Sequence, residues 1–223
     1  MRKLLTILSL MIFNSVCFAQ LQAETYGDPK ESQYAFFTWL IIISVVILGI
    51  VYYNSFSTAD ENVKSAWSQV EIQYQHRADL ISNIVATVKG YAIHEKEVLE
   101  KLTETRAKAG QIVIDPSKCT QQQLDAFQTS QNEIRQALNR VYAIAENYPD
   151  LKANMNFQDL HAQLERTEND IAIARNRYTQ AVCSYNIKIH RFPANFYANF
   201  FSLKEKAYFE AKEFTQNAPS VSF

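Results

Sequence analysis

Apolar residues recur at alternating steps of three and four along most of the chain beyond residue 62. The first such series runs from residue 63 to residue 102, and only Arg77 and Glu95 interrupt its apolar stripe. This spacing places one apolar face along a helix that packs lengthwise against other helices. It therefore predicts one long helix over residues 63–102. Gly90 lies inside this helix, where it permits a close approach of another backbone or a slight bend.

Two further series continue the pattern after turn signals. Glycine and proline between residues 110 and 116 end the first helix. The second helix is expected to run from a cap at Ser117 or Thr120 to Tyr148. The third is expected from about residue 156 to Phe192, which precedes a proline. Since the chain carries no β-hairpin signal, the pattern predicts an all-α fold, an up-and-down bundle of three long helices.

Aromatic residues dominate the stretch that follows, residues 194–201, which predicts a short C-terminal helix. This helix is expected to fold back as a lid on the bundle. The alternative is a docking surface for a partner or for the membrane face. The bundle is expected to span residues 57–213, and residues 214–223 form a polar tail expected to be flexible.

Residues 36–53 contain no charge and only two polar side chains. A helix of this length covers about 27 Å, and flanking residues extend it to the thickness of a bilayer core. Aromatic residues at both ends resemble interfacial belts. The sequence therefore predicts a single transmembrane helix over residues 34–56, ahead of the bundle.

The N-terminal residues have the pattern of a secretory signal. Basic residues precede a short apolar run in residues 1–19, and residues 17–19 suit a cleavage site. A polar segment, residues 20–33, follows and is expected outside the cytoplasm. Cleaved and uncleaved signals both place the helical body on the cytoplasmic side. The expected location is therefore the inner (cytoplasmic) membrane of a bacterium, crossed once by the mature chain.

Composition argues against several kinds of chemistry. The formal net charge of −1 disfavours nucleic-acid binding, which needs a basic surplus. Cys119 and Cys183 are too few and too far apart for a zinc site or a disulfide framework. His76 and His94 share the first expected helix at a spacing that prevents chelation of one ion. We expect no catalytic residues, no metal and no cofactor.

Charged and amide side chains on or near the apolar stripes form a candidate polar layer. Such a layer can fix the register of the helices or form a partner site. Its candidate members are Arg77, Asp79, Asn83, Glu95 and Asn186. A buried charge needs a partner, so structural ion pairs are the simpler interpretation. The expected partners are Glu146 or Glu168 for Arg77, and Arg140 or Arg175 for Glu95.

Several stretches follow one another in the order of a known family pattern. One of them, Arg77-Ala78-Asp79-Leu80-Ile81-Ser82-Asn83-Ile84-Val85, is close to a family stretch read as RxDLIPNLV. The others are residues 62–70, 87–92, 94–95, 103–107, 148–154, 164–165, 171–175, 185–186, 192–193 and 208–210. On these residues the chain resembles the LemA family of bacterial membrane proteins over residues 54–210. It departs from the family at Ser82, where members typically have proline, and in its additional N-terminal apolar segment.

The resemblance implies a helical bundle on a single membrane span, with an external N-terminus and most of the chain inside. No enzymatic activity is established for the family as a class, and its members look like membrane-associated accessory or scaffold proteins. We therefore expect a scaffold or adaptor that acts through self-association, as a homo-oligomer, or by binding an unknown membrane or envelope partner. The alternative is an enzyme or a metal-dependent subunit with a polar site inside the bundle. A sensor of lipids or envelope stress is a third hypothesis.

Overall fold

The computed structural model describes residues 29–91 and 95–210. These residues form helices and connecting segments, and they contain no strand. The helices are α2 (Pro29–Lys89), α3 (Lys96–Gly110), α4 (Gln121–Ala145), α5 (Pro149–Lys152), α6 (Met155–His190) and α7 (Ala194–Phe200). The predicted all-α class is confirmed. The expected signal peptide, most of the polar segment and the expected flexible tail lie outside the described residues.

The chain divides into two compact units, Met1–Asn54 and Ser55–Phe223. In the first, the described residues are an apolar helical segment of α2. This segment is long and apolar enough to cross a membrane, and only 6% of its most apolar stretch is buried. A core helix of a soluble protein would be mostly buried, so the exposure favours the transmembrane interpretation.

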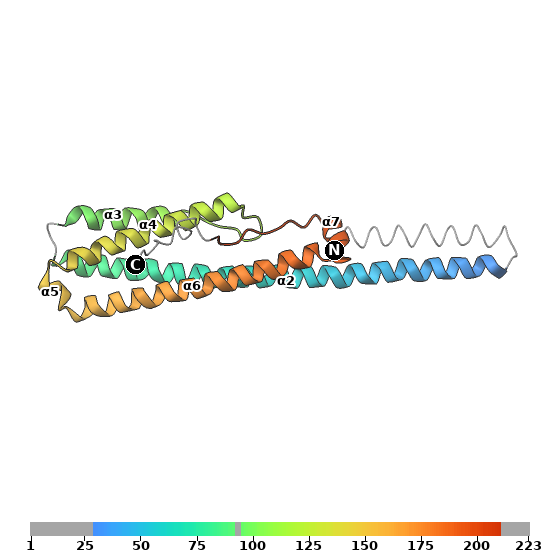
Figure 1. The fold of residues 1–223 in the computed structure, drawn as a ribbon, viewed down its shortest axis with the longest axis horizontal. Coiled ribbons are helices and arrows are strands. Elements are labelled where there is room, and N and C mark those ends of the chain that lie inside the picture. Colours follow the sequence, from blue (N-terminus) through green and yellow to red (C-terminus); the bar gives the residue numbers. More distant parts are fainter. Residues whose placement is uncertain (1–28, 92–94, 211–223) are drawn as a thin grey trace, which may run out of the picture. The chain divides into compact units, whose positions relative to one another are not determined.

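The second unit is built from four long helical stretches: residues 55–89 of α2, then α3, α4 and α6. Figure 1 shows them running lengthwise beside one another. Contacts across the bundle agree with this arrangement. Arg77 of α2 reaches Gln131 of α4 and Glu168 of α6, and Arg106 of α3 donates a hydrogen bond to the α2 carbonyl of Ala78. Short connections between these helices give the expected up-and-down order.

The first expected helix is wrong in one respect, because residues 63–102 are not one helix. α2 ends at Lys89, the chain turns, and α3 begins at Lys96. Leu99 and Leu102 thereby join Ile81 and Ile84 in one buried cluster, which a straight helix would have prevented. The interpretation of Gly90 as a point of close backbone approach is also wrong. A Cβ at this position would meet only the Thr87 carbonyl, at an ordinary 3.6 Å.

Two side-chain caps fix where the later helices begin. The Thr120 hydroxyl accepts a hydrogen bond from the Gln123 amide, and the Gln123 side chain accepts one from the Thr120 amide. This capping box satisfies two amides that the first turn of α4 would leave unpaired. Asn154 caps α6 in a related way, by accepting from the Phe157 amide. Of the two caps considered from the sequence, Ser117 and Thr120, the one at Thr120 is confirmed.

The core has an aliphatic and an aromatic part. The aliphatic part joins all the long helices and includes Ile84, Leu102, Val141 and Leu164. The aromatic part is centred on Trp67, whose ring lies 5.7 Å from Phe127 and 5.2 Å from Tyr178. Large buried rings supply much apolar area for each ordered side chain. The bundle thus owes its stability to the stripes that the spacing predicted.

Replacing a residue of the aliphatic core tests this account. Leu164→Ala removes a side chain that is almost wholly buried in α6, and it should lower the free energy of unfolding by about 2–5 kcal/mol. Met155→Ala, at an exposed position of the same helix, should change it by less than about 0.5 kcal/mol. Thermal unfolding of both variants in a mild detergent measures the difference. Equal effects would contradict the assignment of the core.

Candidate functional site

Arg77 is the centre of a buried polar cluster. Its side chain is 3% exposed, and one guanidinium nitrogen lies 2.7 Å from a carboxylate oxygen of Glu168. The other terminal nitrogen donates to the side-chain oxygen of Gln131. The guanidinium also lies 5.0 Å from the centre of the Tyr74 ring. The cluster therefore joins α2, α4 and α6 at one level, and the predicted pairing of Arg77 with Glu168 is confirmed.

The surroundings of this cluster favour a structural role for its ionisable groups. Burial raises the pKa of Tyr74, although the nearby arginines oppose the rise. The Tyr74 hydroxyl thus stays protonated at neutral pH. Arg77 has a charged partner and an amide partner. Since a buried guanidinium without partners would be strongly destabilising, these contacts account for its presence in the stripe.

Three other candidate members of the polar layer lie elsewhere. Asp79 is exposed and accepts a hydrogen bond from Gln75, at 2.9 Å within the same helix. Asn83 is exposed on α2. Glu95 lies in the turn before α3, and its carboxylate is 3.4 Å from the Tyr148 hydroxyl rather than beside an arginine. The structure therefore does not bring these residues together with Arg77.

Asn186 occupies a second polar site, on α6. Its side-chain amide donates to the Lys206 carbonyl, and its oxygen accepts from the Lys206 amide, both at 3.0 Å. It thereby holds residues 203–210, an extended segment that we call the strap. The strap has no regular secondary structure, so its backbone groups need side-chain partners. Asn186 supplies them much as a neighbouring strand would.

Side chains of α4 and α6 pair with further carbonyls of the strap. The Tyr178 hydroxyl donates to the Ala207 carbonyl at 3.1 Å. The side-chain amides of Gln121 and Gln128 donate to the carbonyls of Tyr208 and Glu210, at 3.1 and 3.3 Å. Their spacing along α4 sets the direction of the strap. Long polar side chains in the bundle therefore serve the backbone of its C-terminal segment.

Lys206 is the buried charge of the strap. Its ammonium group lies 2.6 Å from an Asp60 carboxylate oxygen and 3.2 Å from the Pro116 carbonyl. It also lies 5.0 Å from the centre of the Tyr185 ring. Burial alone would raise the pKa of Asp60, but hydrogen bonds from Lys206 and Lys64 outweigh it, so the pKa is lowered. The ion pair thus joins the strap to the first turns of α2 in this unit.

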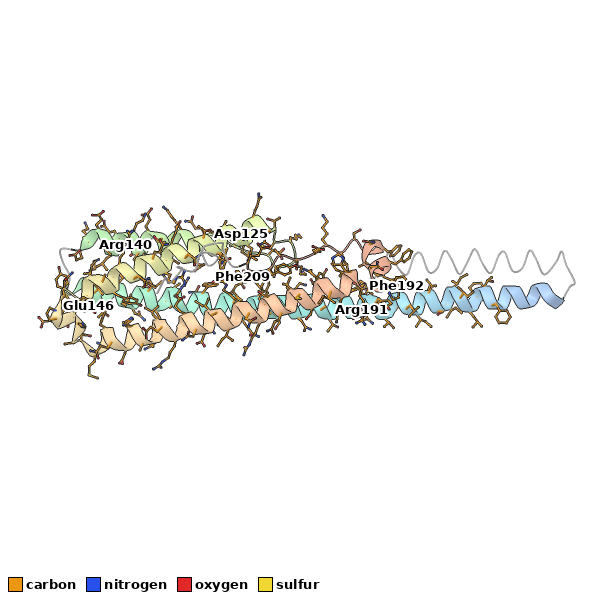
Figure 2. The ribbon with its side chains drawn as sticks, viewed as in Figure 1. Asp125, Arg140, Glu146, Arg191, Phe192 and Phe209 are labelled. Atoms are coloured by element: carbon orange, nitrogen blue, oxygen red, sulfur yellow. The ribbon has the colours of Figure 1, made fainter. Side chains whose placement is uncertain are left out.

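Phe209 packs the strap against the aromatic core. Its ring stacks on Trp67 at 6.1 Å and meets Tyr178 edge-on at 5.5 Å. The Arg175 guanidinium covers it at 4.4 Å. Figure 2 labels Phe209 where the strap passes along the bundle. A ring with these three partners is well fixed, so the strap is an integral part of the body.

Sequence reasoning identified Asn186 and did not identify Lys206 or Asp60. Lys206 follows Lys204 and Glu205 and so gives no signal of burial, because its partner Asp60 lies far away in sequence. The glutamines at 121 and 128 likewise look like ordinary surface residues of a helix. The available signal was that Asn186 lies on an apolar stripe. An amide in this position needs a partner that the other helices did not supply.

A groove of about 400 Å³ lies beside the Arg77 cluster, between α2 and the segment that ends α3. Its lining includes Tyr74, Arg106, Val113 and Phe127. The indole nitrogen of Trp67, which also lines this groove, is buried and has no hydrogen-bond partner among the described residues. The lining combines apolar side chains with Glu71, Arg77 and Arg106, and its described residues include no histidine, cysteine or serine.

The remaining reactive groups are dispersed. Cys119 is half-buried, and this burial raises the pKa of its thiol, which lowers its reactivity at neutral pH. Cys183 is exposed on α6. Within residues 29–91 and 95–210, histidine, cysteine and carboxylate side chains do not gather in groups of three or more that could hold a metal ion. These groups define no reaction.

The structure therefore defines a class: an apolar helical segment joined to an elongated helical bundle whose internal polar groups hold the bundle together. Residues 66–223 match the LemA family, and the chain belongs to this family. It is 26% identical to Protein LemA of Metamycoplasma hominis, over 83% of this chain and 82% of that protein. The predicted family is thus confirmed.

The chain is also similar to magnetosome proteins. It is 25% identical to magnetosome protein MamQ 2 of Paramagnetospirillum magneticum, over 78% of this chain and 70% of that protein. The match to magnetosome protein MamQ of Magnetospirillum gryphiswaldense has 23% identity over the same shares of both chains. None of these names is that of an enzyme. Together with the apolar segment, they indicate a membrane-associated helical protein.

Removing the Asn186 side chain should release the strap. Asn186→Ala leaves the Lys206 amide and carbonyl without their partner, and it should lower the free energy of unfolding by about 1–3 kcal/mol. Hydrogen–deuterium exchange at the Lys206 amide should accelerate. The control is Asn83→Ala, at an exposed position of α2. Unchanged exchange in the Asn186 variant would contradict the role assigned to this residue.

The ion pair between Asp60 and Lys206 predicts a dependence of stability on pH. Because the folded state lowers the pKa of Asp60 from 3.8, the pair stabilises the fold fully above this pH. The stabilisation is lost as pH falls from 3.8 through the lower pKa of the folded state. Asp60→Asn should be less stable by about 1–3 kcal/mol at pH 7, and it should lose less stability on acidification than the unmodified protein.

The matched control for this experiment is Glu104→Gln. Glu104 also has a lowered pKa, chiefly from its hydrogen bond with Lys108, but it lies on the surface of α3. Its replacement should leave stability nearly unchanged at pH 7, since surface ion pairs contribute little. Thermal unfolding midpoints between pH 2 and pH 7 supply the comparison, because the loss occurs below pH 3.8. Identical acid profiles for the Asp60 variant and the unmodified protein would exclude the proposed linkage.

Proposed function

We propose that this protein is a membrane-anchored scaffold whose helical body assembles with a second copy of itself in the cytoplasm of a bacterium. The apolar segment of α2 crosses the inner membrane once. The bundle presents a side surface for association, and it has no catalytic activity of its own. The membership in the LemA family and the exposed apolar segment support the anchored location.

The observation that carries this proposal is an apolar patch between α2 and α6. Ile72 of α2 is 60% exposed and Ile173 of α6 is 51% exposed, although each lies in the middle of its helix. Both line a shallow groove of about 240 Å³. Gln69, Asp170 and Arg177 border it with polar groups. An apolar centre with a polar rim is the usual composition of a protein interface.

The charges at the rim favour a second copy as the occupant. Asp170 and Arg177 lie on the same face of α6, two turns apart, and carry opposite charges. In a two-fold arrangement in which both bundles lie along the membrane surface and their α6 helices are antiparallel, each Arg177 approaches the partner's Asp170, and the Ile173 side chains meet at the axis. Tethering of both copies to one membrane also raises their local concentration. The patch is therefore suited to weak lateral self-association.

The absence of catalysis is part of the proposal. The buried ionisable groups of the bundle, Arg77 and Lys206, have their charges compensated by Glu168 and Asp60. An active site would instead hold its ionisable groups beside space for a substrate, with pKa values suited to proton transfer. The groove at Trp67 is lined by Glu71 and Arg106 as well as by Tyr74, but burial raises the pKa of Tyr74 further away from neutrality. The internal polar contacts therefore support a structural use.

Chemical crosslinking in membranes tests the self-association. The unmodified protein should give a dimer whose fraction rises with the amount of protein per lipid. Ile173→Glu places two like charges at the axis and should weaken association about tenfold, which corresponds to about 1.4 kcal/mol. Val113→Glu is the control, because Val113 is also exposed and apolar but lies in the segment after α3. Monomers at every protein-to-lipid ratio, or equal crosslinking of both variants, would refute the proposal.

A further inference from the structure

The short helix α7 exposes its two phenylalanines and buries its two alanines, while Tyr197 between them is half-buried. Phe196 and Phe200 are 73% and 60% exposed, whereas Ala194 and Ala198 are buried. Each pair is spaced by four residues, so the phenylalanines occupy one face of α7 and the alanines the opposite face. Phe192, which precedes the helix, is 83% exposed. An ordinary surface helix would place the phenylalanines inside, so the exposed aromatic face needs an explanation.

The expected lid does not describe Phe196 and Phe200, whose rings are exposed, whereas Tyr197 and Phe201 are half-buried. A lid would insert its aromatic rings into the end of the bundle. The alanines instead allow α7 to lie close to the body, and its phenylalanines project away from it. We call Phe192, Phe196 and Phe200 the aromatic face. Its arrangement agrees with the second hypothesis from the sequence, a docking surface.

The aromatic face lies at the end of the bundle where the chain enters this unit. α7 follows the C-terminal end of α6, as Figure 1 shows. Just beyond α7, Lys206 binds Asp60 of α2 and Asn186 near the end of α6. Asp60 stands six residues after Asn54, the last residue of the apolar unit. The aromatic face thus belongs to the end of the body that the sequence connects directly to the membrane segment.

Exposed basic side chains flank the aromatic face in the sequence. Lys188, Arg191 and Lys204 are all exposed, and Figure 2 labels Arg191 next to Phe192 at the end of α6. The nearby acidic residue, Glu205, pairs with His190. Exposed phenylalanines among lysine and arginine are the composition of segments that lie in the interface of a bilayer with anionic lipids. A water-exposed surface would gain nothing from this combination.

We propose that the aromatic face lies in the interfacial zone of the membrane, with its phenylalanines among the acyl chains and Lys188 and Arg191 at anionic headgroups. This inference rests on the membrane anchoring proposed above. A second contact with the bilayer, besides the spanning segment, limits the tilting of the bundle. It thereby fixes which side of the body, including the patch at Ile72 and Ile173, faces neighbouring copies.

The test uses the full-length protein in lipid nanodiscs made of equal parts of phosphatidylglycerol and phosphatidylcholine. Single cysteines replace Phe196, Phe200, Met155 or Ile47 in a background where the native cysteines are serine, and each carries a nitroxide spin label. Collision rates with oxygen, which concentrates in lipid, and with a water-soluble nickel chelate are measured by electron paramagnetic resonance. Far-UV circular dichroism confirms that each labelled variant keeps its helices.

Labels at positions 196 and 200 should favour oxygen over nickel several-fold relative to the label at Met155. Met155 is the matched control, because it is an exposed apolar residue at the start of α6, a helix about 54 Å long whose other end precedes α7. Nickel access at 196 and 200 equal to that at 155 would overturn the inference. Shielding from both reagents would also overturn it, in favour of a protein partner.

The label at Ile47 separates this inference from the proposed anchoring. Ile47 lies within the apolar segment and is exposed on its helix. If it favours oxygen while 196 and 200 do not, the anchor stands and the aromatic face does not contact lipid. If the label at Ile47 is itself accessible to the nickel chelate, the proposed membrane anchoring is refuted.

Discussion

The burial of apolar stripes on helices of unequal length is the constraint on which the rest of this structure depends. α2 and α6 carry long stripes, whereas α3 is short, so the helices cannot cover one another over their whole length. The extended strap occupies part of the surface that remains, with Phe209 on Trp67 and Tyr178. Covering the aromatic core therefore requires a segment without its own hydrogen-bonding pattern. The polar side chains of Asn186, Tyr178, Gln121 and Gln128 follow from this requirement.

The two buried cations can be understood in the same way. Arg77 stands where α2, α4 and α6 meet, and its planar group satisfies partners on two helices while its face covers Tyr74. At the other polar site, Lys206 of the strap likewise binds partners on two other segments, Asp60 of α2 and the Pro116 carbonyl before α4. Each cation selects one relative position of its helices, because a shift of one turn would leave a buried charge without a partner. Specificity of packing is a sufficient reason for their presence.

The helix content and most of the core could be predicted from spacing, because burial of one stripe per helix is a local property of the sequence. The end of α2 at Lys89 could not be predicted from spacing, because Tyr91 and Glu95 happen to continue the three-and-four pattern beyond it. Glu95 looked like a buried charge for this reason alone, although it stands just before α3.

Arg77 and Asn186 were found because a polar residue on an apolar stripe is conspicuous. Lys206 and Asp60 were missed because their meeting depends on the tertiary path of the strap. The orientation of α7 was missed as well, since aromatic content does not reveal that Ala194 and Ala198 take the inner face.

Because the buried cations are paired with carboxylates, the features that suggest a function are side chains on the surface of the protein. Inside, each buried cation has its counterion, and the tyrosines of the core are held protonated by burial. Outside, two apolar features lack an equivalent explanation: the isoleucines between α2 and α6, and the phenylalanines of α7. They differ in their neighbours, because the isoleucine patch has charges of both signs at its rim, whereas the aromatic face has mainly basic ones. Mixed charges suit a copy of the same surface, and basic charges suit an anionic one. The two proposals together describe a body with one face for lipid and another for a second copy, which would suit assembly in the plane of a membrane.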